Sequence, residues 1–380
     1  MLEDLRQKID EIDDGIVDLY LKRMAISKEI AEQKNKDGKG VANSKREKEV
    51  LNRVTEKVED DLKGYTKQVF ETLFETSKAY QLRYIDGSSP ARDKIAEVLS
   101  RGVAEFPVKA NVACQGIDGA YSNIACEKLF TLSNIMYFKN FEGVFSAVEK
   151  GLCKYGVLPI ENSIAGSVNA VYDLMKEHNF HIVRSIKLRI QHSLLAKRGV
   201  KLEGVKEIIS HEQAINQCKP FLKTLGDNVK ITTCANTAIA AKMVAESDRM
   251  DIACICSKEC MGIYDLECLK SNIQSADNNY TRFICISKNL EIFEGADRIS
   301  IMMTVSHEAG RLNKILNKFS TLNLNLTKLE SRPLENTSFE FMFYFDFEAN
   351  VQDKQVLNLI GELDNEAQDF IFLGSYSEVK

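Results

Sequence analysis

The chain has 380 residues, 44% of them hydrophobic, and a formal net charge of −5. This length predicts two or three domains with sizeable cores, and the mixed charge lacks the basic block that nucleic-acid-binding proteins carry. No apolar run reaches the roughly 18 residues of a membrane span, and the acidic, amphipathic N-terminus is not a signal peptide. Ten cysteines without a disulfide framework are typical of a reducing cytosol, so we expect a cytoplasmic protein without nucleic-acid or membrane partners.

Residues 1–85 are predicted to be helical, with breaks at Lys36–Gly40 and near Leu62–Gly64. Apolar residues recur at steps of three and four along the first helix, which indicates one apolar face. Arg23 and Lys34 occupy positions on that same face. The apolar members of the stripe are Leu2, Leu5, Ile9, Ile12, Ile16, Leu19, Ile26 and Ile30.

The length of the first helix indicates that its apolar stripe needs a partner. About 34 residues make a helix of roughly 50 Å, too long for the two shorter helices that follow to cover, so we predict a dimer along the stripe. Buried cations need partners, and no carboxylate falls on the stripe, so Arg23 and Lys34 predict an anionic ligand. Arg6 lies roughly 25 Å from Arg23 and reaches such a ligand only in an antiparallel partner chain.

These segments resemble the helical class of chorismate mutase, on LRQKID, KRM, EQK, KREKE and TSKAYQ within residues 1–85. The resemblance implies a rearrangement of chorismate to prephenate, which needs a constrained conformation and stabilised charge on the breaking ether oxygen. It implies that Lys34 and Gln81 face that oxygen, that the arginines anchor carboxylates and that Glu47 accepts the hydroxyl. The substrate-binding residues are then Arg6, Arg23, Asn43, Arg46, Glu47 and Ser77.

One position departs from the resemblance. Asn43 stands where the family usually has an aspartate, which removes a charge that would balance Lys34. The alternative interpretation is therefore an inactive helical dimerisation arm whose arginines reach solvent.

Residues 108–288 alternate short apolar strands with helical stretches, which is typical of an α/β domain with mostly parallel strands and two lobes. Four cysteines, Cys254, Cys256, Cys260 and Cys268, cluster there without paired C-x2-C spacing, which favours buried small hydrophobes over a metal site. Strands are predicted at Val108–Cys114, Tyr155–Ile160, His181–Leu188, Glu207–Ser210, Ile252–Ile255 and Arg282–Ser287. Helices are predicted at Ser122–Leu129, Phe141–Lys150, Ala165–Glu177, His211–Thr224 and Asn236–Glu246.

Polar motifs stand at the ends of several of these strands. Glycines at Gly116–Ser122 precede a predicted helix, and they do not complete a dinucleotide-binding G-x-G-x-x-G. Gly156–Ser163 ends a strand in Glu161, Asn162 and Ser163, where open α/β sheets bind ligands. Ser210–Cys218 and Asn279–Phe283 follow in the second lobe and on the strand that returns to the first.

Together the motifs GxxGxYS, GVLPIENS, SHxQAxxQC and TRF resemble prephenate dehydratase over about 180 residues. The resemblance implies loss of water and CO2 from prephenate to give phenylpyruvate. It implies that Thr281 helps protonate the leaving hydroxyl, while Glu161 is a candidate acid whose alternative is a structural acceptor. His192 and His211 are interpreted as structural or peripheral. The expected substrate-binding residues are Tyr121, Ser122, Asn162, Ser163, Gln213 and Arg282, the last of which strand alternation could instead turn away from Thr281.

Residues 297–380 show the βαββαβ order of a ferredoxin-like fold. The segment resembles an ACT domain, an amino-acid sensor, which implies a phenylalanine site between two such domains. Arg311 follows Gly310 where the family has a small residue. The implied effector-binding residues are Gly310, Leu312, Glu330, Ser331, Arg332 and Pro333.

The sequence therefore predicts a multidomain enzyme: an all-α mutase-like domain at 1–90, a linker at 91–107, a two-lobed α/β dehydratase domain resembling periplasmic binding proteins at 108–288, and an α+β ferredoxin-like ACT domain at 297–380. It is expected to take chorismate to phenylpyruvate under phenylalanine control, as a homodimer or larger homo-oligomer, with neither metal nor organic cofactor. The alternatives are a dehydratase with an inactive arm and a non-enzymatic amino-acid-sensing protein.

Overall fold

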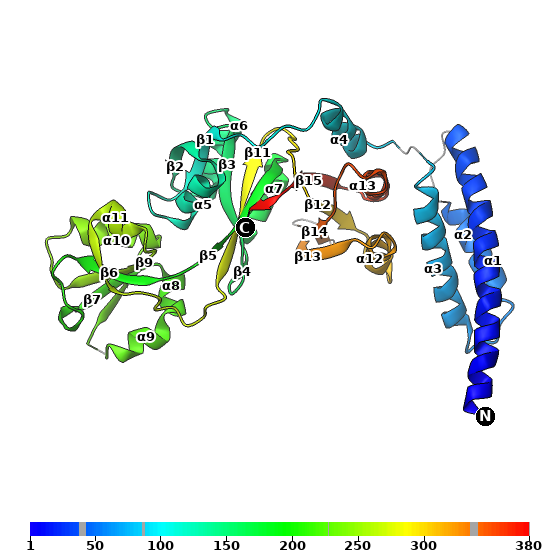
Figure 1. Cartoon of the computed structure of the whole chain (residues 1–380), viewed down its shortest axis with the longest axis horizontal. Helices are drawn as coiled ribbons and strands as arrows, with labels where there is room; N and C mark the ends of the chain where they lie inside the picture. The colour runs from blue at the N-terminus through cyan, green and yellow to red at the C-terminus, as the bar shows by residue number, and fades with distance from the viewer. Residues whose placement is uncertain (38–42, 86–87, 227, 335–340, 380) are drawn as a thin grey trace. The chain divides into compact units, whose positions relative to one another are not determined.

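The computed structural model describes residues 1–37, 43–85, 88–226, 228–334 and 341–379, and it forms two compact units (Figure 1). The first unit contains residues 1–102 and 297–372, and the second contains residues 103–296 and 373–380. Each unit has its own sheet or sheets and its own core. No helix within these ranges has the length and apolar character needed to cross a bilayer.

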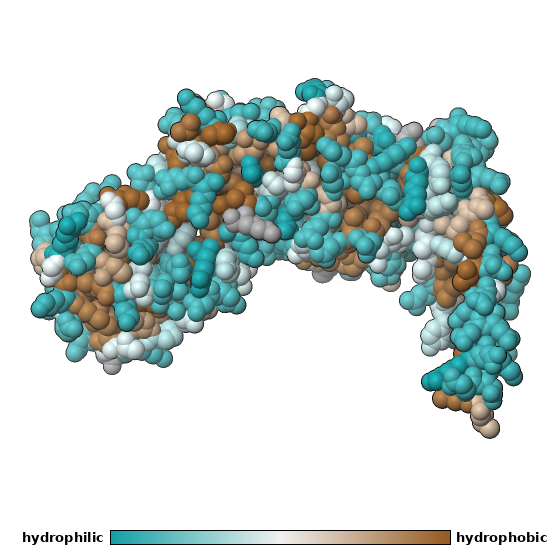
Figure 2. All heavy atoms as spheres, in the orientation of Figure 1, coloured by the Kyte–Doolittle hydropathy of each residue, from teal (hydrophilic) through white to brown (hydrophobic). Residues whose placement is uncertain are grey.

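A helical arm formed by α1 (Leu2–Lys36), α2 (Ser44–Thr55) and α3 (Lys63–Gln81) opens the first unit. The long first helix is confirmed at 35 residues, and both α1 and α2 contact α3. The predicted break at Lys36–Gly40 coincides with the end of α1, but residues 38–42 lie outside the described residues. The apolar stripe of α1 stays exposed, from 44% at Ile30 to 68% at Leu19, and apolar side chains reach the surface of the arm in Figure 2.

The segment 91–107, expected to link two domains, is mostly occupied by helix α4 (Pro90–Ser100). Ser89 caps this helix by accepting a hydrogen bond from the backbone N–H of Arg92 at 3.2 Å, and proline fits the first turn, where no intrahelical donor is needed. The side chain of Arg92 donates to Asn358 at 3.2 Å, which attaches α4 to α13.

A four-stranded sheet with two helices completes the first unit. Its elements are β12 (Arg298–Val305), α12 (Arg311–Thr321), β13 (Asn325–Pro333), β14 (Phe341–Glu348), α13 (Lys354–Glu366) and β15 (Phe370–Tyr376). The strand order β13-β14-β12-β15 is that of a ferredoxin-like fold, which confirms the predicted βαββαβ succession. Phe319 of α12 packs on Phe345 and Phe347 of β14 and forms the centre of the core.

Two sheets form the two lobes of the second unit. The first lobe contains β1 (Lys109–Gln115), α5 (Tyr121–Leu129), β2 (Leu132–Phe138), α6 (Phe141–Glu149), β3 (Tyr155–Asn162), β4 (Gly166–Ser167), α7 (Asn169–His178), β5 (His181–Arg189), β11 (Tyr280–Ser287) and β16 (Glu378–Val379). The second contains β6 (Ser193–Lys197), β7 (Glu207–Ser210), α8 (Glu212–Gln217), α9 (Lys219–Thr224), β8 (Lys230–Thr233), α10 (Thr237–Glu246), β9 (Ile252–Cys256), α11 (Cys260–Tyr264) and β10 (Leu266–Lys270).

Both sheets are mixed, which corrects the expectation of mostly parallel strands. β1 pairs in parallel with β2 and β3, whereas β11 runs antiparallel to β3 and β5. The return of β11 to the first lobe is confirmed, and antiparallel pairing follows because the chain comes back from the second lobe. The helix predicted at His211–Thr224 is divided at Cys218, beside Pro220, whose ring removes a backbone donor.

Candidate active sites

A polar cluster lies inside the helical arm, between α1 and α3. Arg23 donates from Nη1 to the carbonyl of Leu73 at 3.0 Å and also to the hydroxyl of Ser77. Ser77 and Gln81 are one helical turn apart and only 4% and 7% exposed. The Oε1 atom of Gln81 is buried and accepts no hydrogen bond from the described residues. Such an atom is costly unless a ligand donates to it, so the cluster has the character of a binding site.

Lys34 and Glu47 extend this cluster to α2. Burial lowers the pKa of Lys34, and the charge of Glu47 opposes that shift, so the two groups interact electrostatically. Burial likewise lowers the pKa of Arg23. Glu47 also lies 3.4 Å from the ammonium of Lys78. Two cations of α1 and a carboxylate of α2 thus belong to the predicted site, as expected for a site that binds an anion bearing a hydroxyl.

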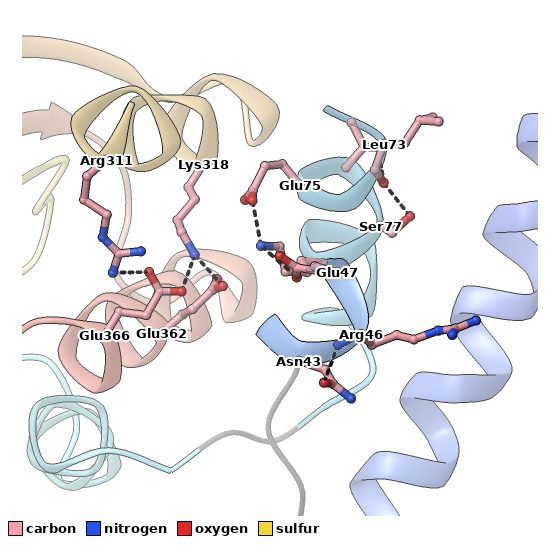
Figure 3. Close-up of polar contacts among 12 residues, drawn as sticks. Asn43, Arg46, Glu47, Leu73, Glu75, Ser77, Arg311, Lys318, Glu362 and Glu366 are labelled. Atoms are coloured by element: carbon pink, nitrogen blue, oxygen red, sulfur yellow. Dashed lines mark hydrogen bonds and ion pairs between the residues drawn. The ribbon is translucent and has the colours of Figure 1, made fainter. Parts of the chain in front are cut away.

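Three of the predicted mutase residues of the same chain, Arg6, Arg46 and Asn43, do not belong to this cluster. Arg6 is exposed and pairs with Glu3 at 3.2 Å, as expected if it serves a partner chain. Arg46 is also exposed and pairs with Glu49 at 3.2 Å. Asn43 caps α2 by accepting a hydrogen bond from the backbone N–H of Arg46 at 3.1 Å (Figure 3). Its amide therefore has a structural role as the cap of α2.

The second unit contains a cavity of about 480 Å³ between its two lobes. Five predicted residues line it, and they come from two strands of the first sheet and from the starts of α5 and α8: Tyr121, Ser122, Asn162, Gln213 and Thr281. The hydroxyl of Tyr121 accepts from the backbone N–H of Gln191 at 2.9 Å and also contacts its carbonyl, so this ring is held against the segment that joins β5 of the first lobe to β6 of the second. The motifs that carried the dehydratase resemblance thus converge on one place.

A network of amides orients the groups at this cavity. Asn162 donates from Nδ2 to the hydroxyl of Thr281 at 2.9 Å, and its Oδ1 accepts from the backbone N–H groups of Ile164 and Ala165. Because these bonds lock the amide, the Thr281 oxygen accepts a hydrogen bond from Asn162, and its own O–H is left to point elsewhere. The cavity lies beside it, so Thr281 can act there as a proton donor.

The same network continues to a histidine. Asn162 donates to Asn279 at 2.8 Å, Asn279 donates to Gln217 at 2.9 Å, and the Nε2 atom of His192 lies 2.8 Å from the same Gln217 oxygen. Since that oxygen can only accept, we assign the ring proton to Nε2. Burial lowers the pKa of His192, although the bond to Gln217 opposes this, so the ring is neutral.

Both histidines line the cavity, which corrects their interpretation as peripheral. His211 does have a structural role, since its Nδ1 accepts from the backbone N–H of Gln213 and caps α8. Sequence reasoning overlooked Gln217 and Asn279, although both lie within motifs that it singled out. The available signal was the second glutamine of Ser210–Cys218 and the asparagine before Thr281.

Three expected residues do not line the cavity. Thr281 is opposite Asn162 in the pairing of β11 with β3, and Arg282 is opposite Glu161. Side chains alternate between the two faces of a sheet, so Glu161 and Arg282 lie on the face away from the cavity. There Arg282 pairs with Glu378 at 3.4 Å. The structure therefore corrects the expected catalytic role of Glu161 and the expected substrate-binding role of Arg282.

Ser163 is the third of these residues. Its hydroxyl donates to the carbonyl of Asn278 at 2.8 Å and accepts from the backbone N–H of Tyr280 at 2.9 Å. Both bonds hold the chain next to Thr281 in place, so Ser163 supports the site without touching the cavity.

The described residues that line the cavity include no aspartate, glutamate, lysine or arginine. Helices α5 and α7 begin at its wall without a side-chain cap, so their first backbone N–H groups can bind an anion, whereas the start of α10 is capped by Asn236, which accepts from the backbone N–H of Ile239 at 2.7 Å. The electrostatics of this site thus come from helix termini, amides and hydroxyls. Such a site accepts carboxylates and has no counter-ion for an ammonium group.

The expected effector residues lie at two places in the ferredoxin-like domain. Gly310 precedes α12 with φ of 80°, a conformation that favours glycine, and Leu312 is in the first turn. Glu330, Ser331, Arg332 and Pro333 end β13, and the chain then enters residues 335–340, which are not described. Arg311 pairs with Glu366 of α13 at 3.6 Å, so its side chain is held against its own domain.

Two family models match parts of the chain. Residues 112–291 match the family model for prephenate dehydratase, and residues 5–82 match the model for chorismate mutase type II. A bifunctional chorismate mutase/prephenate dehydratase of Buchnera aphidicola is 29% identical over 99% of this chain and 96% of its own length. Arogenate dehydratase 2 of Petunia hybrida is 35% identical over 78% of this chain and 79% of its own.

A solved structure shows the same fold over much of the chain. The prephenate dehydratase of Arthrobacter aurescens, in complex with L-Phe, is 26% identical with a TM-score of 0.64, and the match covers 70% of this chain and 89% of that one. The chain therefore belongs to the prephenate dehydratase family and joins that domain to an N-terminal chorismate mutase type II domain.

Proposed function

We propose that the chain catalyses two successive reactions, the rearrangement of chorismate to prephenate in the helical arm and the conversion of prephenate to phenylpyruvate, water and CO2 in the cavity. The observation that carries the second assignment is the Thr281 hydroxyl, oriented by Asn162 at the cavity wall. The buried Oε1 of Gln81, which has no hydrogen-bond partner among the described residues, and the hydrogen bond from Arg23 to Ser77 support the first. Both domain matches support the pair.

The mutase reaction needs positioning and electrostatic stabilisation rather than a nucleophile. In this proposal Lys34 and Gln81 face the ether oxygen, on which negative charge develops as its bond to carbon breaks. Arg23 binds a carboxylate, and Glu47 accepts the substrate hydroxyl. The neutral amide at Asn43 leaves the site more positive than the family pattern.

A second copy of the chain completes this site in our proposal. The α1 stripe exposes Ile9, Ile12 and Ile16 by 56%, 62% and 58%, which is unusual for a regular apolar face. An antiparallel copy would cover the stripe and bring its Arg6 to the ligand.

The dehydratase reaction follows from the neutral character of the cavity. The helix starts hold the two carboxylates of prephenate, and the Thr281 O–H donates to the hydroxyl that leaves. The ring C–O bond breaks as the bond to the departing CO2 supplies its electron pair to the ring. Because the ring becomes aromatic, the site needs only to orient the substrate and supply one proton.

Arogenate is a second candidate substrate, since several plant relatives are arogenate dehydratases at 34–36% identity. Arogenate carries an ammonium group where prephenate has a keto oxygen. The described cavity residues offer no carboxylate to balance it. We therefore assign prephenate as the preferred substrate, and comparing kcat/KM for the two substrates tests this choice.

We assign residues 1–90 to the mutase, 108–288 to the dehydratase and 297–380 to an ACT domain that senses phenylalanine. The ferredoxin-like strand order and the L-Phe complex of the Arthrobacter relative support this assignment. Gly310, Leu312 and Glu330–Pro333 would bind phenylalanine, and inhibition requires that the effector prefer one of two states.

One assay tests the whole assignment. Purified protein is given chorismate alone, with and without phenylalanine, and the products are identified. Phenylpyruvate that diminishes with phenylalanine is expected. Unconsumed chorismate, with prephenate still converted, would reduce the arm to a dimerisation module. Failure to convert either substrate would leave the amino-acid-sensing alternative.

A further inference from the structure

Lys78 follows Ser77 on α3, but its side chain leaves the helix toward a different set of partners. It is 13% exposed and lies 2.6 Å from the carboxylate of Glu75 and 3.4 Å from that of Glu47. Figure 3 shows Glu75 and Glu47 turned toward the same point from α3 and α2. Glu47 is an expected substrate-binding residue, so Lys78 contacts the mutase site through the Glu47 carboxylate.

The charge of Lys78 is retained despite its burial. Burial by itself would lower the pKa of Lys78, but Glu75 and Glu47 outweigh it, and the pKa lies above its ordinary value. Glu47 also raises the pKa of Lys34 against the effect of burial. The Glu47 carboxylate therefore lies in the field of two lysines, Lys34 of α1 and Lys78 of α3.

The ferredoxin-like domain closes the other side of Lys78. A small cavity is lined by Glu75, Lys78, Lys318 and Glu362. Lys318 is 6% exposed and is held by Glu362 and Glu366 at 2.5 and 2.9 Å (Figure 3). The positive charge of Lys318 repels that of Lys78 and lowers its pKa, although the two carboxylates outweigh this effect. Lys78 is thus kept between the two arm carboxylates, because the neighbouring space already contains an ammonium.

We propose that Lys78 is a positioning residue of the mutase reaction, which holds the Glu47 carboxylate against α3 so that it meets the substrate hydroxyl and does not close onto Lys34. Without Lys78, two carboxylates would face each other in a half-buried space, and Glu47 would move toward the nearest remaining cation. Glu47 would then neutralise the group expected at the ether oxygen. This inference rests on the proposed mutase function.

The test begins with Lys78→Met in the full chain. The wild-type rate with chorismate is measured first, because an inactive wild type would contradict the mutase function itself rather than the role of Lys78. We expect kcat/KM for chorismate to fall roughly ten- to a hundredfold, the scale of a misplaced ligand group. Prephenate conversion should stay within twofold, since it occurs in the other unit. Lys67→Met, an exposed lysine on the same helix, is the matched control.

Further variants separate positioning from mere support of the fold. If Lys78 only neutralises Glu75, then Glu75→Gln combined with Lys78→Met restores activity, which would overturn the proposal. If it positions Glu47, the combined variant remains impaired and Lys78→Arg recovers much of the activity. In a Glu47→Gln background, Lys78→Met should have little additional effect on kcat, whereas a full additive loss would contradict the proposal.

Discussion

The two candidate sites of this chain differ in charge: the mutase site contains charged side chains, whereas neutral side chains line the dehydratase cavity. The mutase site contains Arg23 and Lys34 of α1 and Glu47 of α2, and burial lowers the pKa of both cations. The dehydratase cavity contains amides, hydroxyls and a neutral histidine, and no charged side chain lines it within the described residues. This difference fits the two proposed reactions. The mutase must stabilise charge on an ether oxygen. The dehydratase gains its driving force from aromatisation and needs only one well-placed proton donor.

The sites also differ in completeness. A network from Thr281 to His192 encloses the dehydratase site within one chain. The mutase site has an exposed apolar helix beside it, and Arg6 is turned to solvent. We therefore expect the mutase activity to depend on association of two chains and the dehydratase activity not to depend on it.

The largest expected effect is that of Lys34→Ala on the mutase. Removing the cation at the ether oxygen should lower kcat roughly 10²- to 10³-fold, while prephenate conversion is unchanged. Steady-state rates with each substrate measure both. An unchanged mutase rate would show that the arm does not use Lys34 for catalysis.

Thr281→Ala is the matched change in the other site. Loss of the oriented hydroxyl should lower kcat on prephenate roughly 10²-fold and leave the mutase rate intact. Thr281→Ser keeps the donor and should keep most of the rate. Normal turnover by the alanine variant would refute the assigned proton donor.

Ile12→Asp tests whether only the mutase needs a second chain. A charge in the middle of the α1 stripe should prevent association and lower mutase activity about tenfold or more, because an unpaired carboxylate is costly in an apolar interface. Sedimentation should show a smaller species, with prephenate conversion preserved. Gln7→Asp adds the same charge off the stripe and serves as the control; an equal loss there would argue against the interface.

The smallest effect concerns pH and the neutral histidine. The folded state lowers the pKa of His192, so below the ordinary value of about 6.5 the unfolded chain binds a proton that the folded chain resists. Stability of the second unit should therefore fall as the pH drops below about 6.5, by at most about 1.4 kcal/mol per pH unit from this group. Urea unfolding at pH 7.5 and 5.5 measures the slope, and His192→Gln should flatten it. Equal slopes would show that the ring is not held neutral.

Much of the molecule could be predicted from residues close together in the chain. The period of the α1 stripe is a local property, and so is the βαββαβ succession. Motifs such as GVLPIENS identified strand ends, because small and polar residues there have a local backbone role. These signals predicted Asn162, Gln213 and Thr281 as neighbours of one cavity, and the structure places them there.

Only the tertiary structure decided which side chains meet. Glu161 and Arg282 directly adjoin residues that line the cavity, but the pairing of β11 with β3 turns them to the other face of the sheet. His192 and Asn279 meet through Gln217, and Lys78 lies beside Lys318 across a contact between domains. The sequence by itself determined the elements, their order and the motif-bearing loops, because these depend on local periodicity and turn chemistry. Strand register and packing decided the hydrogen-bond partners and the charge neighbours, because those depend on groups far apart in the chain.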